Sequence, residues 1–206
     1  MADRLRTGID ALDRKLEGGL PRGTLVAYTA EPASQSERLL YELTAARDVH
    51  YLSTERSVRA VRSALEAAPV TVDEPRVEAL PTDGLEEATR TVADLREETL
   101  LIVDTADRLE RTDPDDYVAF LNDLKETLLE TDSVAVLHCL RGAEPRNRTR
   151  TLHAADAVFE LHTDRVGGRL ETVLTVPTFR YGGQPTEAIT LELSDGVAID
   201  TSRDIA

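Results

Sequence analysis

An apolar run, a short polar loop and an amphipathic helix, in that order, constrain the fold of this chain most strongly. Residues 25–28 have the composition of a buried strand, and apolar residues recur at helical spacing over 38–43. α/β proteins hold phosphate at such a unit, because the loop and the free N–H groups of the first helical turn face the ligand. The sequence therefore predicts an α/β fold organised around this strand, loop and helix.

The loop lacks the residues that bind phosphate in such units. A phosphate-binding loop reads G-x-x-x-x-G-K-[ST], with glycines that wrap the phosphate, a lysine that neutralises it and a hydroxyl that binds Mg²⁺. The corresponding positions in this chain are Ala30, Glu31, Pro32, Ala33, Ser34, Gln35, Ser36 and Glu37. Both glycines, the lysine and the hydroxyl are replaced, and two carboxylates are added. We therefore predict a phosphate-binding architecture that has lost its phosphate site.

Residues 34–37 also fit the capping-box pattern S-x-x-E ahead of an apolar helix. In that motif Ser34 accepts a hydrogen bond from the N–H of Glu37, and the Glu37 carboxylate reaches back to the N–H of Ser34. A carboxylate about 5 Å from a triphosphate costs about 3 kcal/mol at an effective dielectric constant of about 20. Glu31 and Glu37 thus predict that MgATP binds weakly or not at all. No cofactor is expected. ATP and magnesium would be cofactors only if the nucleotide site is still functional. A plain strand-to-helix connection with a good cap explains the same residues.

Strands and helices alternate along most of the chain, which implies a parallel sheet with right-handed crossovers. The expected helices cover 7–15, 38–46, 57–68 and 85–95, and a further helix starts at Asp113-Pro114 and buries Tyr117, Leu121, Leu124 and Leu128. The expected strands after the first are 49–54, 77–80, 99–104 and 134–140. In the last third, strands 158–161 and 170–176 meet through Gly167-Gly168, and 189–193 and 197–199 through Asp195-Gly196, which are hairpin signals. We expect one domain over 1–206, mostly parallel, with antiparallel strands at its C-terminal end.

The charge balance of the chain indicates an adaptation to the solvent and does not identify a binding partner. The chain of 206 residues has a net charge of −15, and Lys15 and Lys125 are its only lysines. Many carboxylates with few lysines and aromatics favour a protein of a halophilic archaeon, and the alternative is an ordinary acidic cytosolic protein. The acidic balance argues against a large nucleic-acid footprint. One cysteine, no apolar run of about 18 residues and no signal-peptide core predict a cytoplasmic protein without membrane contact.

Four stretches carry a family resemblance. Thr-Gly-Ile-Asp-Ala-Leu-Asp at 7–13, followed by Gly-Gly-Leu-Pro-Arg-Gly at 18–23, resembles the start of KaiC-like and RadA-like ATPases of the RecA superfamily. The resemblance continues at 52–56, where the family has a strand that ends in one or two glutamates, and at 100–104, which looks like Walker B. Residues 169–180 resemble the closing strands of the family. The resemblance implies a RecA-like three-layer core, ATP bound between subunits, and ring or filament assembly. The sequence departs from the family pattern in the phosphate loop, residues 30–37.

Two acids lie where the family does its chemistry. Asp104 ends a strand at the carboxyl edge of the sheet, where α/β proteins place ligands. The resemblance makes it the carboxylate on the magnesium side, and the alternative is a turn-forming residue. Glu55 matches the glutamate that activates water, and the alternative is a loop acid bonded to Arg56 or Arg59. Without a bound γ-phosphate Glu55 has nothing to act on, so no catalytic residue is predicted.

A basic segment follows the strand 134–140. Residues 141–150 contain one acid, Glu144, and four arginines: Arg141, Arg146, Arg148 and Arg150. RecA-like proteins place a loop here that faces DNA or the neighbouring subunit. A contact with an acidic partner and a solvated loop that neutralises nearby carboxylates explain these arginines equally well. No aromatic residue lies between them, which weakens the case for stacking on single strands.

No metal site is predicted, because the spacings of His50, His138, His153, His162 and Cys139 match no ligand pattern. His138 and Cys139 are adjacent on a strand and therefore point to opposite faces.

Three functions follow. The first is a non-catalytic RecA/KaiC-like paralogue, regulatory or scaffolding, whose partner is a protein, either itself or a related active ATPase. The second is an ATPase that retains nucleotide with Asp104, Glu55 and residues of a partner. The third is a nucleic-acid-associated protein in recombination or transcription control, which binds through 141–150.

Overall fold

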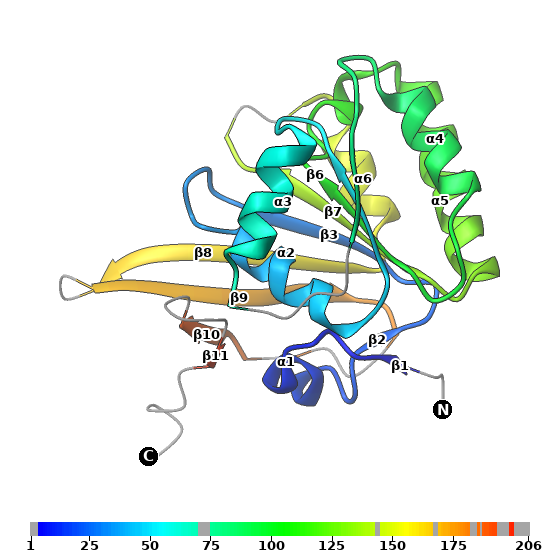
Figure 1. The fold of residues 1–206 in the computed structure, drawn as a ribbon. Coiled ribbons are helices and arrows are strands. Elements are labelled where there is room, and N and C mark those ends of the chain that lie inside the picture. The colour runs from blue at the N-terminus through cyan, green and yellow to red at the C-terminus, as the bar shows by residue number, and fades with distance from the viewer. Residues whose placement is uncertain are drawn as a thin grey trace.

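A central sheet with helices on both faces forms the fold (Figure 1). The computed structural model describes residues 4–69, 75–142, 145–166, 169–181, 185, 187–192 and 198–199. Its strands are β1 (Arg4–Leu5), β2 (Leu20–Pro21), β3 (Leu25–Ala30), β4 (Val49–Ser53), β5 (Arg76–Ala79), β6 (Leu100–Asp104), β7 (Val134–Leu140), β8 (Ala157–Val166), β9 (Arg169–Phe179), β10 (Ile189–Glu192) and β11 (Ala198–Ile199). Its α-helices are α1 (Asp10–Lys15), α2 (Glu37–Leu43), α3 (Val58–Glu66), α4 (Leu85–Ala93), α5 (Pro114–Glu130) and α6 (Arg148–Ala154). Two 3₁₀ turns, η1 (Thr44–Ala46) and η2 (Leu109–Arg111), complete the described elements.

The large sheet has the order β11-β10-β9-β8-β3-β7-β6-β4-β5. The neighbouring strands in the part β8-β3-β7-β6-β4-β5 of this order pair in parallel. The neighbouring strands in the part β11-β10-β9-β8 pair antiparallel. This confirms the predicted fold class, a mostly parallel sheet that ends in antiparallel strands. The turn residues expected at the two hairpin joints, Gly167-Gly168 and Asp195-Gly196, lie outside the described residues.

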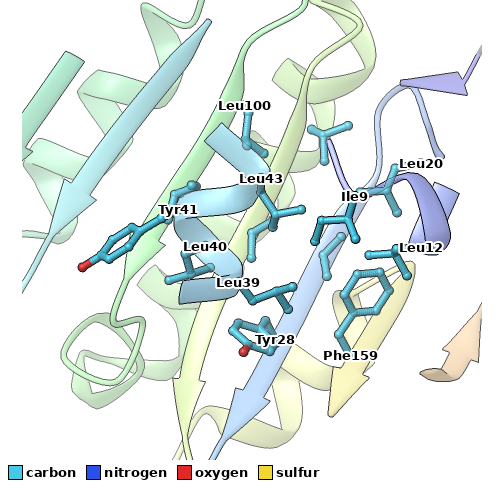
Figure 2. Packing of buried hydrophobic residues seen from close by; sticks show 14 of the residues in the cluster. Ile9, Leu12, Leu20, Tyr28, Leu39, Leu40, Tyr41, Leu43, Leu100 and Phe159 are labelled. Atoms are coloured by element: carbon cyan, nitrogen blue, oxygen red, sulfur yellow. The ribbon is translucent and has the colours of Figure 1, made fainter. Parts of the chain in front are cut away.

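Alternating side chains of the parallel strands divide the core into two layers. Figure 2 shows the first layer, in which Leu39, Leu40 and Leu43 of α2 pack near Tyr28 of β3 and Phe159 of β8. The second layer lies on the opposite face, where α4 and α5 pack on Leu101, Val103, Ala135 and Leu137. Since each strand of a parallel sheet is covered on both faces, such strands read as nearly continuous apolar runs.

Local sequence signals explain where the best-defined helices begin. The side chain of Asp113 accepts a hydrogen bond from the N–H of Asp115 at 2.9 Å, and Pro114 occupies the first helical position of α5. The four residues expected to face inward, Tyr117, Leu121, Leu124 and Leu128, are buried. Ser57 caps α3 in the same way, through the N–H of Ala60 at 3.3 Å. These helices therefore start within one residue of the predicted positions.

The first helix and the segment 141–150 differ from the prediction. α1 begins at Asp10 rather than at residue 7, because the backbone N–H and the hydroxyl of Thr7 both donate to Asp13 at 2.7 Å and hold Thr7 outside the helix. The segment 141–150 is not a loop throughout, since α6 starts at Arg148. In the part of the chain that the structure describes, no helix is long and apolar enough to cross a membrane.

Candidate functional site

The carboxyl ends of four parallel strands bring polar side chains into one row. Tyr28 of β3 pairs in register with His138 of β7. His138 in turn pairs with Asp104 of β6, and Asp104 pairs with Ser53 of β4. Asp104 and His138 lie on the face of the sheet that α1, α2 and α3 cover, because Tyr28 and Ile102 belong to that layer of the core. Asp104 and the phosphate-type loop thus meet at the same edge, as the sequence predicted.

Both carboxylate oxygens of Asp104 are occupied by donors from the protein. Oδ1 lies 2.7 Å from Nδ1 of His138. Oδ2 accepts from the hydroxyl of Tyr51 at 2.6 Å and from Nη2 of Arg56 at 2.7 Å. Asp104 is only 4% exposed, so these three donors replace the water that an exposed carboxylate would bind.

The same contacts fix the ionisation of the site. Burial alone would raise the pKa of Asp104, but the hydrogen bonds from His138 and Tyr51 and the charge of Arg56 lower it to about 2. Burial and the neighbouring Asp104 raise the pKa of Tyr51 well above its usual value, so its phenol stays protonated and donates. Burial would lower the pKa of Arg56, and its phenol and carboxylate neighbours more than reverse this. Asp104 and Arg56 therefore form an ion pair at every ordinary pH.

Arg56 also joins the site to the helix that follows the loop. Its Nη1 donates to the hydroxyl of Tyr41 at 2.8 Å, and its guanidinium lies 5.9 Å from the centre of the Tyr41 ring. On the other side of Asp104, the rings of His138 and Tyr28 stack with centroids 5.2 Å apart. The Tyr28 hydroxyl then donates to the carbonyl of Ser36 at 3.2 Å. One polar network therefore connects the start of α2 to β3, β4, β6 and β7.

The loop itself has a backbone that its residue types do not favour. Ala33 and Gln35 have φ values of 64° and 57°, in the left-handed region where L residues cost roughly 1–2 kcal/mol each. Gln35 stands where the phosphate-binding pattern has its second glycine. The chain has thus kept a glycine-type backbone conformation at this position without the glycine.

The predicted capping box is wrong. Ser36, not Ser34, is the residue before α2, and its side chain makes no capping hydrogen bond. Ser34 instead turns back on the loop, where its hydroxyl donates to the carbonyl of Glu31 at 2.6 Å and its N–H approaches the same oxygen at 3.2 Å. A serine hydroxyl often bonds to a nearby backbone group in this way, and here the local turn replaces the cap. Glu31 is exposed and Glu37 half-buried.

Glu55 faces solvent and pairs outside the network. Its carboxylate accepts from Nε of Arg108 at 2.8 Å, and its side chain is 50% exposed. The alternative considered from the sequence paired it with Arg56 or Arg59. Arg56 instead donates to Asp104, and Glu55 pairs with Arg108, which follows β6.

The basic segment divides into buried and exposed members. Arg148 is 2% exposed, and its Nη2 donates to Asp107 at 3.0 Å while its Nε donates to Glu110 at 2.9 Å. Nη1 of Arg148 donates to the carbonyl of Leu140 at 2.9 Å. The prediction that Arg148 contacts a partner is therefore wrong, because its charge is used inside the protein.

The other three arginines lie nearer the surface. Arg141 is half-buried and donates to the carbonyl of Leu161 at 2.9 Å. Arg146 is exposed, and its Nη2 donates to the carbonyl of Thr112 at 2.6 Å. Arg150 is exposed on α6. Of the four arginines in this segment, Arg146 and Arg150 are the exposed ones.

Sequence reasoning missed the residues that hold Asp104. The signal available was the position of Arg56, a charged residue three places after the end of a buried strand at the same sheet edge as Asp104. His138 and Cys139 point to opposite faces, since His138 bonds Asp104 and Cys139 packs in the α4/α5 layer. Over the described ranges, no group of three or more His, Cys, Asp or Glu side chains could hold a metal ion.

Two solved structures share this architecture. A KaiC-like protein, PH0186, from the hyperthermophilic archaeon Pyrococcus horikoshii OT3 has a TM-score of 0.76 at 15% identity, over 97% of this chain and 100% of that chain. The flagellar accessory protein FlaH from Methanocaldococcus jannaschii has a TM-score of 0.79 at 16% identity, over 97% of this chain and 99% of that chain. These likenesses confirm the RecA-like fold and concern the fold alone.

No curated protein matches the sequence. One family model matches residues 4–206, which is nearly the whole chain, and its description is a family of unknown function, DUF7125. On that match the chain belongs to the DUF7125 family.

Proposed function

We propose that this protein is a non-catalytic relative of RecA/KaiC-like ATPases, which acts as a regulatory or scaffolding protein through protein–protein contacts. The observation that carries the proposal is the state of Asp104. The residue at the magnesium side of such sites has both oxygens occupied by His138, Tyr51 and Arg56. A carboxylate engaged in this way supports an internal structural role rather than a role toward a nucleotide.

The residues around Asp104 do not fit MgATP. Magnesium in phosphoryl-transfer sites is held by a carboxylate, a hydroxyl and phosphate oxygens, and a lysine neutralises the transferred group. Here a guanidinium already lies beside the carboxylate, and Glu37 and Ser36 stand at the hydroxyl and lysine positions. Glu31 adds a further exposed carboxylate to the loop. Charge repulsion and the missing cation both support the proposed loss of nucleotide binding.

The proposed partner is a protein, either a second copy of this chain or a related active ATPase. Arg146 and Arg150 are the exposed cations of the basic segment, in a chain whose net charge is −15. Charged groups that face solvent mainly set the choice of partner and the rate of association. The same proposal assigns the protein to the cytoplasm of a halophile, where its acidic surface is an adaptation to salt.

An ATPase is the second candidate, and one observation favours it. Ala33 and Gln35 keep a left-handed backbone, the conformation for which phosphate loops use glycine. Backbone strain tends to persist where function maintains it. Under this alternative the loop still wraps a phosphate, and a partner supplies the missing cation.

Calorimetric titration of the purified protein in molar KCl separates the two candidates. MgATP and metal-free ATP are titrated in parallel, with an active RecA-like ATPase from a halophile as the positive control. The first proposal expects no saturable heat at micromolar ligand. A saturable isotherm with about one nucleotide per chain or per subunit interface would replace it with the second.

A further inference from the structure

Arg56 contacts three separate elements of the site at once. Its guanidinium donates to oxygen atoms from three separate elements: the hydroxyl of Tyr41 in α2, the hydroxyl of Tyr51 in β4 and the carboxylate of Asp104 in β6. The distances are 2.8, 3.1 and 2.7 Å. The planar fork of arginine can reach three acceptors at once, which the single ammonium of lysine cannot do in the same geometry.

We propose that Arg56 is a built-in cation that occupies the cation site beside Asp104 and closes that site to metal ions. This deepens the proposed non-catalytic function, because it names the group that closes the site. The folded state then carries its own counter-ion and depends on neither metal nor nucleotide. Arg56 acts as a positioning residue: through Tyr41 it holds α2 against the sheet edge at which Asp104 ends β6.

The charges around the site explain why a cation must be present. Asp104 is ionised and 4% exposed, and a buried charge without a partner is strongly unfavourable. Glu37 adds negative potential at the same place, since it raises the pKa of both Tyr28 and Tyr41 in addition to their burial. Arg56 is the described arginine that pairs with Asp104. Removing it leaves the buried Asp104 with His138 and Tyr51 as its remaining side-chain partners and without its arginine.

Such a vacated site has the chemistry of a divalent-cation site. Carboxylate oxygens are the ligands that Mg²⁺ and Mn²⁺ prefer, and His138 and Tyr51 lie within hydrogen-bond distance of Asp104. The protein with Arg56 in place should bind no Mn²⁺ here. The protein without it should bind one ion through Asp104.

The test measures Mn²⁺ alone, by electron paramagnetic resonance of free and bound ion, on the full chain at fixed molar KCl. Arg56→Ala is the variant, and Arg59→Ala is the matched control, because Arg59 is an exposed arginine three residues further on. We expect about one bound Mn²⁺ per chain in Arg56→Ala. We expect no such site in the unchanged protein, in Arg59→Ala or in Arg56→Ala combined with Asp104→Asn.

Thermal unfolding gives a second readout that covers poor folding of the variant. Mn²⁺ should raise the Tm of Arg56→Ala by several degrees, or fold it if it is unfolded without metal, and should leave the Tm of Arg59→Ala unchanged. Arg56→Gln serves as the milder variant. The proposal is overturned if the unchanged protein binds Mn²⁺ at Asp104, or if neither Arg56 variant gains a site or stability from Mn²⁺. Neither result depends on whether ATP binds. The calorimetric titration with ATP therefore tests the proposed function independently of this experiment.

Discussion

Nη2 of Arg56 lies 2.7 Å from Oδ2 of Asp104, although the two residues are 48 positions apart in the sequence. The contact joins the segment after β4 to the last residue of β6, which are neighbours in the sheet. It places a positive charge at the carboxyl edge of the parallel strands, where Asp104 ends β6. The stability and the chemistry of the site therefore depend on an ion pair internal to the chain.

Acid should weaken the fold through Asp104. Its pKa is about 2 in the folded protein and 3.8 in the absence of its neighbours, so its contribution is fully present above about pH 4. The contribution is lost as the pH falls through about 2, and its size is about 2 kcal/mol at one pKa unit per 1.36 kcal/mol. Asp104→Asn should lower the free energy of unfolding by at least this much at neutral pH. The gap from the unchanged protein should close toward pH 2, as measured by denaturant unfolding at several pH values. Asp83→Asn, at an exposed position, should show no such gap.

The sequence predicted the sheet and most elements because apolar periodicity and caps are local signals. Asp104 was placed at the correct edge for the same reason. Its partner was not found, because Arg56 and Asp104 meet only once β4 and β6 are adjacent, and strand order is not a local property. α6 was missed since its start contains few apolar residues, and the buried ion pairs of Arg148 anchor it instead. The capping box failed because α2 begins only after Ser36, and because the Ser34 hydroxyl donates to the carbonyl of Glu31 rather than accepting from a helix N–H.

Arg148→Met should destabilise the protein severely. It leaves the carboxylates of Asp107 and Glu110 without their cation, and Glu110 is 0% exposed. Removing one partner of a buried ion pair costs about 3–5 kcal/mol. Denaturant unfolding should show a loss of this size. Arg150→Met, an exposed arginine two residues away, should change stability by less than about 0.5 kcal/mol. Equal losses in both variants would contradict the role assigned to Arg148.

Reversing the charge of Arg146 and Arg150 should abolish the proposed protein contact without unfolding the domain. Both side chains are exposed, so Arg146→Glu with Arg150→Glu should leave the Tm close to that of the unchanged protein. Light scattering tests whether the chain associates with itself, and pull-down with a related ATPase tests the other partner. Exchange of the exposed Arg59 and Arg62 for glutamate is the matched control. Unchanged association in the Arg146/Arg150 variant would assign these arginines to solvent.

Restoring the phosphate-loop residues alone should not restore hydrolysis. Gln35→Gly, Ser36→Lys and Glu37→Thr together return the glycine, the cation and the hydroxyl, and Gln35→Gly also removes a left-handed L residue. Asp104 would still be held by Arg56, and Ala30 and Glu31 would remain in the loop. Phosphate release from MgATP, measured in molar KCl, should therefore stay at the background rate in the triple variant. Adding Arg56→Ala, Ala30→Gly and Glu31→Gly should be needed before MgATP binding appears in calorimetry. Hydrolysis by the triple variant would mean that the ion pair does not close the site.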